Sequence, residues 1–289
     1  MNILGTGLSG LVGSRVVELL SDEFSFTNLS KETGIDITDS QKLTAEIINS
    51  RATWVFHFAA YTDVDGAESQ RALSVSSQAW KVNVLATETV VQVCRQYHKR
   101  LLYISTDYVF DGKKESYTEE SAPAPQGWYA VTKYEGEKRV ATLAKNALIV
   151  RIANPYQAAT VGKSDFFHKI LNRLESNQEV TAPTDQLFVP TFVDDIAQGI
   201  RILVKNDSHG IYHVVGSGAL TPFAAARQIA EKFKLDQDLI KKTTFAEFFT
   251  GRAPRPFSAV LKNDKITRLG VHMRSFSEGL EALALQLAA

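Results

Sequence analysis

The stretch Asn2-Ile3-Leu4-Gly5-Thr6-Gly7-Leu8-Ser9-Gly10-Leu11-Val12-Gly13 joins a short apolar strand to the start of a helix. Three of its glycines follow the spacing G-x-x-G-x-x-G. Such a loop turns sharply and lets backbone approach a pyrophosphate, which then meets the N–H groups at the start of the helix. A tight turn without a ligand is the alternative that the loop alone leaves open. The favoured prediction is a dinucleotide site with contacts from Gly7, Leu8, Ser9, Gly10, Leu11 and Val12.

Beyond this loop, strand and helix signals alternate through the first half of the chain. Apolar runs predict strands at 24–29, 54–60, 101–105 and 147–152, and helical spacing predicts helices at 11–20, 40–50, 80–97 and 129–143, with Ser40 as a cap. The run from Trp54 to Ala60 is continuously apolar, as in a strand buried on both faces. This order predicts an α/β fold, a Rossmann-type doubly wound parallel sheet with right-handed crossovers.

The second half is more mixed. We predict helices at 165–176, 194–205 and 221–234 and a strand at 210–216. Thr221 and Pro222 form a helix start, with a capping hydroxyl and proline at the first position. The composition changes near Asn154-Pro155. We therefore expect a dinucleotide-binding domain at residues 1–153. Residues 154–289 would form mainly a smaller C-terminal α/β substrate lobe, with segments that return to the first domain.

The composition narrows the class of protein. The 289 residues include 32 basic and 32 acidic side chains, which gives no electrostatic reason to expect nucleic acid or an anionic membrane as a partner. No stretch approaches the ~20 apolar residues of a membrane span, and Met1 leads directly into a strand. The single cysteine, Cys94, is expected in the core. We expect a soluble cytoplasmic protein. The oligomeric state stays open, with a homodimer among the options.

A second motif carries the chemistry. Tyr129 and Lys133 stand four residues apart in a predicted helix and therefore share one face. The unperturbed pKa of a phenol is ~10, and a nearby ammonium lowers it. Ser105 and Thr106 end a strand, where side chains face the ligand crevice of a parallel sheet. Thr106 is placed to donate a hydrogen bond to a carbonyl oxygen beside Tyr129. These residues predict carbonyl reduction, although a Ser/Thr turn cap is the alternative for the strand end.

The end of the second strand bears on cofactor choice. The sequence Asn28-Leu29-Ser30-Lys31 lacks the carboxylate that bonds a ribose 2′-hydroxyl in NAD sites. Ser30 and Lys31 are candidates for a 2′-phosphate, which favours NADPH over NADH, although a solvated turn lysine is an equal alternative. Asp36 and Ile37 follow, where the acid is placed to accept from the adenine amino group.

Small residues end the third strand. Phe58-Ala59-Ala60-Tyr61 allows a flat cofactor to lie close to the backbone. His57, inside that strand, is expected to be a core histidine rather than a catalyst. We interpret Asp63, Asp65 and Glu68 as a solvated turn and helix start rather than a metal site, and we predict no metal.

Several segments together resemble the extended short-chain dehydrogenase/reductases. Within that group the chain is most similar to the dTDP-4-dehydrorhamnose reductase family, which acts on nucleotide sugars. The matching segments span most of the chain: Gly7 to Gly13, Ala59 to Glu68, Val82-Asn83-Val84, Ser105 to Gly112, Tyr129 to Glu137, Asp185-Gln186 with Pro190-Thr191, and Arg255-Pro256.

The resemblance implies roles for individual residues. Tyr129 would be the general acid, Lys133 would hold the nicotinamide ribose and lower the pKa of the tyrosine, and Thr106 would complete the triad. Asn83 would lie near the cofactor. The implied activity is NAD(P)H-dependent reduction of a nucleotide-activated 4-keto-6-deoxy sugar, as in dTDP-rhamnose biosynthesis.

The chain also departs from the family. After Arg151 it reads Ile152-Ala153-Asn154-Pro155-Tyr156, where the family typically has Thr-Ser-Trp-Val-Tyr. Asn-Pro-Tyr is closer to sugar epimerases and dehydratases of the same superfamily. Dehydration ranks low, because Thr106 is followed by Asp107-Tyr108 instead of Asp-Glu. Two alternatives remain: a sugar-nucleotide epimerase, and a non-catalytic, cofactor-binding regulatory subunit that resembles the beta subunit of methionine adenosyltransferase.

Contacts to the nucleotide-sugar substrate are the hardest to predict. Arg252 and Arg255 are candidates for a diphosphate, which a guanidinium binds bidentately, and a solvated basic turn is an equal alternative. Tyr156 is a candidate for stacking, with core packing favoured. The full set of substrate candidates is Thr62, Val64, Thr106, Asn154, Tyr156, Arg252 and Arg255.

Overall fold

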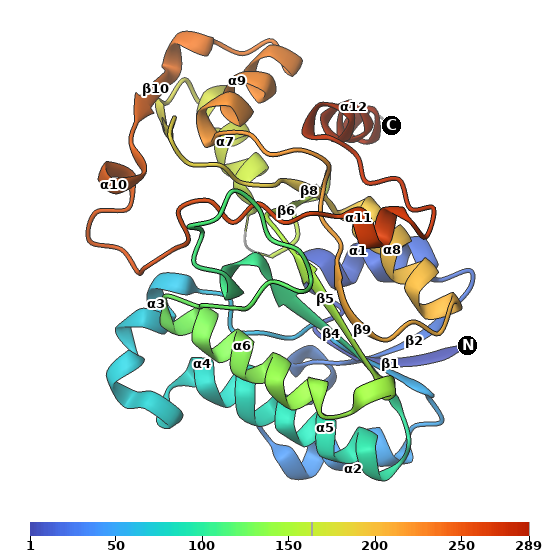
Figure 1. Cartoon of the computed structure of the whole chain (residues 1–289). Helices are drawn as coiled ribbons and strands as arrows, with labels where there is room; N and C mark the ends of the chain where they lie inside the picture. The colour runs from blue at the N-terminus through green and yellow to red at the C-terminus, as the bar shows by residue number, and fades with distance from the viewer. Residues whose placement is uncertain (163, 289) are drawn as a thin grey trace.

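A six-stranded parallel sheet runs through the lower half of the molecule in the computed structural model, which describes residues 1–162 and 164–288 (Figure 1). The strand order is β2-β1-β3-β4-β5-β9, and every pair is parallel. This confirms the doubly wound fold. The strands are β1 (Asn2–Thr6), β2 (Ser25–Leu29), β3 (Trp54–His57), β4 (Arg100–Thr106), β5 (Ala147–Ile152) and β9 (Gly210–His213).

The order of the strands creates a crevice. The chain passes from β1 to β2 on one side and then to β3 on the other side of β1. Ligands of open parallel sheets bind at such a reversal, beyond the carboxyl ends of the strands. β3 is shorter than predicted because the chain leaves the sheet after His57, where the N–H groups of Phe58 and Ala59 both donate to the carbonyl of Thr6.

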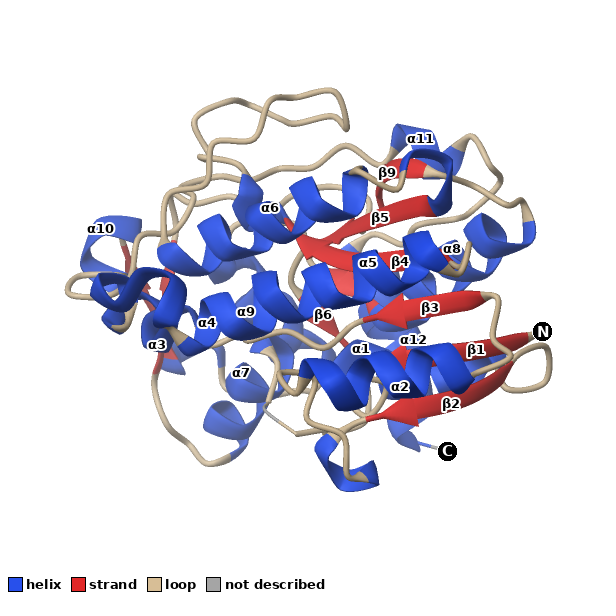
Figure 2. Cartoon of the chain, turned by 90° about the horizontal axis from the view of Figure 1, so that it is seen from below, coloured by secondary structure: helices blue, strands red, loops and turns tan. Residues whose placement is uncertain are grey.

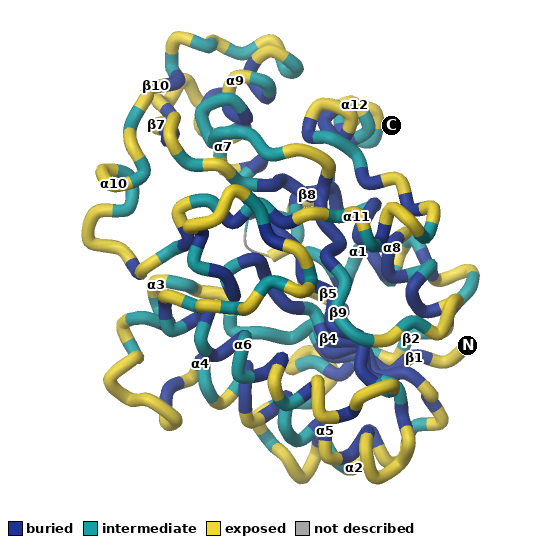
Figure 3. Tube along the Cα trace, in the orientation of Figure 1, coloured by how far each residue is buried: buried dark blue, intermediate teal, exposed yellow. Residues whose placement is uncertain are grey.

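Two layers of helices cover the sheet. One face packs on α1 (Leu11–Leu20) and α8 (Val193–Lys205), and the other on α2 (Ser40–Asn49), α5 (Thr87–Gln96) and α6 (Trp128–Ala141), seen in front of the strands in Figure 2. Neighbouring residues of β1 serve opposite faces: Ile3 joins the first core and Leu4 the second. The strands are accordingly buried throughout the middle of the molecule (Figure 3).

The predicted helix at 80–97 is a composite. It begins as α4 (Gln78–Trp80), passes through a π-helical turn, η3 (Lys81–Ala86), and continues as α5. π-Helical turns occur frequently at functional sites. The predicted cap Ser40 is wrong by one residue, because Asp39 accepts the hydrogen bond from the N–H of Lys42 (3.1 Å).

A smaller lobe lies above the sheet in Figure 1. Two short strand pairs and three helices build it around an aromatic core that includes Tyr156, Phe167 and Phe192. Thr221 caps its helix as predicted (3.0 Å to the N–H of Ala224). Its elements are β6 (Pro155–Tyr156), α7 (Phe166–Glu175), β7 (Val180–Pro183), β8 (Thr191–Phe192), α9 (Pro222–Lys232), β10 (Ile240–Thr243) and α12 (Phe276–Ala288).

Shorter elements complete the chain. They are α3 (Val64–Ser69), α10 (Phe245–Phe248), α11 (Asp264–Thr267) and the 3₁₀ turns η1 (Lys31–Thr33), η2 (Arg71–Ser76), η4 (Asp107–Val109), η5 (Ala144–Asn146) and η6 (Gln237–Leu239). Across residues 1–162 and 164–288, no helix is both long and apolar enough to cross a membrane.

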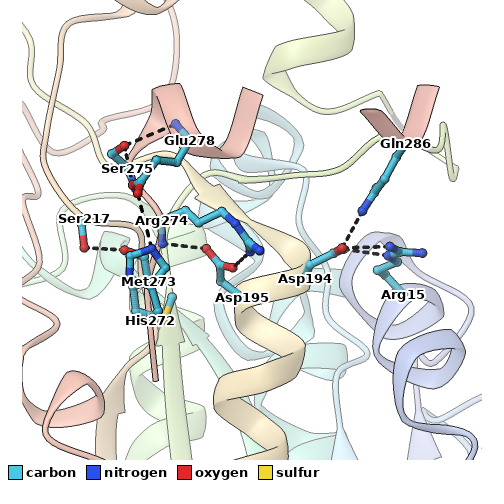
Figure 4. A network of polar contacts seen from close by, with 10 residues as sticks. All are labelled: Arg15, Asp194, Asp195, Ser217, His272, Met273, Arg274, Ser275, Glu278 and Gln286. Carbon is cyan, nitrogen blue, oxygen red and sulfur yellow. Dashed lines mark hydrogen bonds and ion pairs between the residues drawn. The ribbon is translucent and has the colours of Figure 1, made fainter. Parts of the chain in front are cut away.

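Polar contacts tie late segments of the chain to the first helix (Figure 4). Asp194 of α8 accepts hydrogen bonds from Arg15 of α1 (2.7 Å) and from Gln286 of α12 (2.7 Å). On the same helix, Asp195 accepts from the N–H of Arg274 (2.8 Å) and pairs with its guanidinium. Segments after residue 153 thus hold the helix that follows the glycine loop. The boundary at residues 153 and 154 stays a prediction.

Candidate active site

The glycine loop lies where β1 meets the end of β3. At Gly7, where φ is +70°, a Cβ atom would lie 2.4 Å from the nitrogen of Ala59, and at Gly13 it would lie 2.4 Å from the carbonyl oxygen of Gly7. Both glycines are therefore required by the protein's own packing. At Gly10 the nearest atom would be the oxygen of Gly7, at 3.3 Å, and φ is an ordinary −80°. Internal packing does not explain this glycine, whereas the approach of a ligand would.

The start of α1 is open to an anion. Gly10 is its cap residue and has no side chain with which to satisfy the first N–H groups of the helix. Ser9 is exposed, and Leu11 and Val12 are half-buried around this end. Leu8 differs from the prediction, because its side chain is in the core and its N–H donates to the Asn28 side chain (3.3 Å). The hydrogen bond from Leu8 holds the loop against β2. The free N–H groups at the N-terminus of α1 are therefore the groups that can bind a pyrophosphate.

The segment after β2 shapes the outer end of the crevice. Asp36 accepts from the N–H and hydroxyl of Thr38 (2.9 and 2.7 Å) and pairs with Lys31 (3.0 Å), which lowers its pKa to about 2. Lys31 is 77% exposed, so this pair contributes little and the ammonium stays available. Ile37 lines a hollow of about 560 Å³ together with η3 and the start of α5. The hydroxyl of Ser30 is enclosed, without a hydrogen-bond partner among the described residues.

Asn83 holds the end of β3 in place. Its amide oxygen accepts from the N–H of Tyr61 (2.8 Å), and its amide nitrogen donates to the Tyr61 carbonyl (3.1 Å) and to Thr132 of α6 (3.0 Å). Asn83 is buried, and its place near the cofactor stays a prediction. It fixes the half-buried segment of Phe58, Ala59, Ala60 and Tyr61, against which a cofactor would lie.

Two residues are in the core, as predicted. His57 lies between the hydroxyls of Thr6 (2.7 Å) and Thr87 (3.0 Å), and burial together with the charge of Lys133 lowers its pKa to about 3. Cys94 is buried, which raises the pKa of its thiol to about 12. Burial thus favours the uncharged form of both side chains, in agreement with their predicted place in the core.

Thr106, Tyr129 and Lys133 meet at the carboxyl end of β4. Thr106 lies close enough to the hydroxyl of Tyr129 to lower the pKa of that phenol, against the larger effect of burial. Thr106 donates its proton to the carboxylate of Asp107 (3.0 Å) and accepts from the N–H of Tyr108 (3.2 Å). The hydrogen bond from Thr106 to a substrate carbonyl stays a prediction of the sequence.

The pKa values of the pair differ from the prediction. Tyr129 is 9% exposed, and its burial raises the pKa of the phenol, which the carboxylate of Asp107 raises further. Lys133 is 3% exposed, and burial lowers its pKa to about 7 although Glu137 opposes the shift. Its ammonium donates to the carbonyl of Ile104 (2.8 Å) and lies 4.1 Å from the ring of Tyr103. Loss of water, which the sequence does not reveal, outweighs the neighbouring charge.

Asp107 is a site residue that our sequence reasoning missed. It is buried, and burial raises its pKa to about 7, although the Thr106 hydroxyl and backbone N–H groups stabilise the charged form. Its position directly after Thr106 was the available signal. It begins η4, and this turn directs the carboxylate back to the threonine.

The two arginines differ in their surroundings. Arg255 donates to the carbonyl of Ala253 (2.7 Å) and pairs with Asp65 (2.9 Å), and its charge opposes the rise that burial causes in the pKa of Tyr108. Arg252 is exposed and lies over Phe248 and Phe249, 5.4 and 5.9 Å from their ring centres. Arg252 is therefore the freer of the two for a diphosphate.

The remaining substrate candidates occupy varied positions. Tyr156 is 1% exposed and packs among phenylalanines of the upper lobe, which confirms the favoured core packing. Asn154 is half-buried and has a positive φ of 42°. Its carbonyl accepts a hydrogen bond from the N–H of Thr191 (3.2 Å) at the point where the chain passes from β5 into the lobe. Thr62 is exposed and Val64, the first residue of α3, is half-buried.

The three acids near α3 have separate partners. Asp63 caps α3 through the N–H of Gly66 (3.1 Å), Asp65 pairs with Arg255, and Glu68 accepts from the N–H of Trp128 (2.6 Å). The interpretation as a solvated turn and helix start holds for Asp63 and Asp65, which are exposed at the start of α3, whereas Glu68 is half-buried. Among the described residues, no group of three or more His, Cys, Asp or Glu side chains is arranged to hold a metal ion.

Known proteins resemble this chain over its whole length. The model of the family described as "RmlD substrate binding domain" matches residues 1–288. A dTDP-4-dehydrorhamnose reductase of Mycobacterium tuberculosis is 32% identical over 98% of this chain and 91% of its own. A solved dTDP-4-dehydrorhamnose reductase from Bacillus anthracis, in complex with NADP, has a TM-score of 0.89 at 29% identity, covering 99% of both chains. One from Clostridium acetobutylicum has a TM-score of 0.88 at 28% identity, covering 100% of both.

Proposed function

Since this chain belongs to the RmlD substrate binding domain family, we propose that it is an NADPH-dependent reductase of a nucleotide-activated 4-keto-6-deoxy sugar. One observation carries the proposal: Tyr129 and Lys133 lie beside Thr106 at the carboxyl end of β4, in the sheet whose first strand leads into an uncapped helix N-terminus. The relatives name the first compound to test, dTDP-4-dehydrorhamnose.

The residues divide between cofactor and proton chemistry. The N-terminus of α1 would hold the pyrophosphate, Lys31 the 2′-phosphate, and Lys133 the nicotinamide ribose. When bound, the cofactor supplies the hydride for the keto carbon. Tyr129 supplies the proton for the keto oxygen, and its raised pKa keeps the phenol protonated until that moment. The ammonium of Lys133 then stabilises the phenolate, an effect that is larger in a site without water.

Substrate identity is the finer part of the proposal. The segment of Asn154, Pro155 and Tyr156 departs from the sequence typical of the family and leads from β5 into the upper lobe, where we place the sugar. Arg252 is our candidate for the diphosphate. A cytoplasmic location and a homodimer stay predictions of the sequence.

Consumption of NADPH by the purified protein tests the function. We expect loss of nicotinamide absorbance with a dTDP-linked 4-keto-6-deoxy sugar and much slower loss with a UDP-linked one. Tyr129→Phe should lower kcat by at least ~100-fold, the usual scale for a positioned general acid, while NADPH still binds. Interconversion of sugar isomers without net loss of NADPH would indicate an epimerase. Tight cofactor binding with no turnover of any keto-sugar would favour the regulatory role.

A further inference from the structure

We propose that α3 positions Tyr129 for proton transfer, through Glu68 at the start of α6 and through Asp65 by way of Arg255 and Tyr108. The proposal rests on the proposed function, because it concerns the same proton donor. α3 lies against the first turn of α6 (Figure 1). Its two carboxylates have partners far away in the sequence, although Asp65 is itself exposed and only Glu68 is half-buried.

The first contact is with the backbone next to Tyr129. Glu68 accepts a hydrogen bond of 2.6 Å from the N–H of Trp128, the first residue of α6. The cap residue of α6 is Gly127, which has no side chain to cap the helix, and the first turn of α6 contains no acid. The first N–H groups of a helix need acceptors, and a negative charge there is favourable. Glu68 thus supplies from another helix the cap that α6 lacks.

The indole of Trp128 reinforces this anchor. Its Nε1 donates to the hydroxyl of Ser77 (3.0 Å), and its ring stacks on Trp80 with the ring centres 5.7 Å apart. Both the main chain and the side chain of the residue before Tyr129 are therefore held. The direction in which the Tyr129 side chain leaves the helix depends on that fixed backbone.

The second contact reaches the ring of Tyr129. Asp65 accepts from the N–H of Ala253 (2.9 Å) and pairs with Arg255 (2.9 Å), whose side chain is 9% exposed. Arg255 lies close enough to Tyr108 for its charge to oppose the rise that burial causes in the pKa of that phenol. The ring of Tyr108 meets that of Tyr129 edge-on, with centres 5.7 Å apart and planes at 80°. Asp65 therefore sets the position of Arg255, and Arg255 the position of the ring that flanks the proton donor.

Together the contacts hold Tyr129 from two sides. Proton transfer needs heavy atoms within hydrogen-bond reach, and a displacement of about 1 Å from the productive geometry can cost about 100-fold in rate. Glu68, Asp65 and Arg255 touch neither substrate nor cofactor in this account. They are positioning residues, and their removal should lower kcat without weakening the binding of NADPH.

Single variants on α3 test this directly. With NADPH and a dTDP-linked 4-keto-6-deoxy sugar, we expect Glu68→Ala and Asp65→Ala to lower kcat by about tenfold to 100-fold, with Kd for NADPH unchanged. Glu68→Gln keeps an acceptor oxygen and should recover most of the rate. Asp63→Ala is the matched control, because Asp63 caps α3 itself and, among the residues that the structure describes, has no hydrogen bond to α6 or to the loop of Ala253. A loss of kcat as large in Asp63→Ala would overturn the proposal.

A double-variant cycle separates positioning from damage to the fold. If Glu68 acts through Tyr129, then Glu68→Ala in the Tyr129→Phe background should leave the residual rate within about twofold. A variant that merely loosens the fold would lower the rate by the same factor in both backgrounds. An equal loss in both backgrounds would therefore contradict the assigned role.

One measurement does not depend on the substrate. Amide hydrogen exchange of residues 128–133 should be faster in Glu68→Ala than in wild type and unchanged in Asp63→Ala. Unchanged exchange in Glu68→Ala would overturn the proposal even if kcat falls. If wild-type protein reduces no keto-sugar, the proposed function fails, while the exchange experiment still decides whether Glu68 holds the start of α6.

Discussion

Replacing Gly10 with alanine separates what the glycine loop does for the fold from what it does for a ligand. The new Cβ atom would lie 3.3 Å from the carbonyl oxygen of Gly7. Apart from the residues adjacent to Gly10 in the sequence, no other described atom would lie within 4 Å of it. The backbone at Gly10 has an ordinary φ of −80°. The same methyl group would stand at the uncapped start of α1, where we place the pyrophosphate.

The expected change in stability is small. Alanine at a compatible backbone position gains about 0.4–1 kcal/mol by restricting the unfolded chain. Alanine is a poorer cap residue than glycine, which costs up to about 1 kcal/mol. The two effects nearly cancel, and for a chain of this size a residual 1 kcal/mol would move Tm by only about 2–4 °C.

The expected change in binding is larger. A hydrogen bond to a charged group contributes about 1.5–3 kcal/mol, and the methyl group would keep at least one N–H from the phosphate. At 1.4 kcal/mol per factor of ten, loss of one such bond raises Kd for NADPH by about 10- to 150-fold. Calorimetric titration of NADPH, together with thermal unfolding of the unliganded protein, measures both quantities.

Gly7→Ala is the informative contrast. There φ is +70° and the Cβ atom would overlap backbone at 2.4 Å, so this variant should lose stability before any ligand is added. If Gly10→Ala binds NADPH as tightly as wild type, the pyrophosphate does not lie on this helix, and our account of the loop is refuted. A large drop in the Tm of the unliganded Gly10→Ala variant would instead show that Gly10 is required for the stability of the fold.

Three further predictions concern charges. First, kcat/KM for reduction should fall as the pH rises through about 7, because Lys133 loses its proton there. Asp107→Asn removes the other group that has a pKa of about 7 and should leave this decline in place, and a kcat/KM that does not change with pH would contradict the role of Lys133. Second, Arg151→Met should cost about 3–5 kcal/mol in chemical denaturation, because Glu137, paired at 2.7 Å, would remain as an uncompensated buried charge, and a loss under 1 kcal/mol would count against this. Third, Lys31→Ala should raise Kd for NADPH by about tenfold and leave NADH within about twofold; equal effects on both would exclude the 2′-phosphate contact.

Local patterns predicted the cofactor half well. The helix at 11–20 has the predicted bounds, since its apolar spacing directly follows the glycines that start it. The strand at 147–152 is also as predicted, because a continuous apolar run bounded by polar residues is typical of a buried parallel strand. In both cases the residues that decide the structure are adjacent in the chain.

Contacts between distant segments could not be predicted in this way. Glu68 and Asp65 read as solvated acids, because nothing nearby in the sequence shows that Trp128 or Arg255 will lie beside them. The hydrogen bonds of Asn83 to Tyr61 and Thr132 were likewise not predicted, because these residues are far apart in the sequence. What sequence patterns miss falls on polar residues, whose role depends on which neighbour the fold brings to them.

Burial also explains why the shifts at Tyr129 and Lys133 are compatible with catalysis. A proton donor must hold its proton before the reaction, and the raised pKa of Tyr129 ensures this. The cost of the phenolate that follows must be met at the moment of transfer, and the charge of Lys133 has its largest effect where water is excluded. That charge is itself costly to bury, so Glu137 favours it and Arg151 pairs with Glu137 in turn (2.7 Å). The same low-dielectric environment thus keeps Tyr129 protonated before the reaction and strengthens the attraction between the Lys133 ammonium and the phenolate that forms.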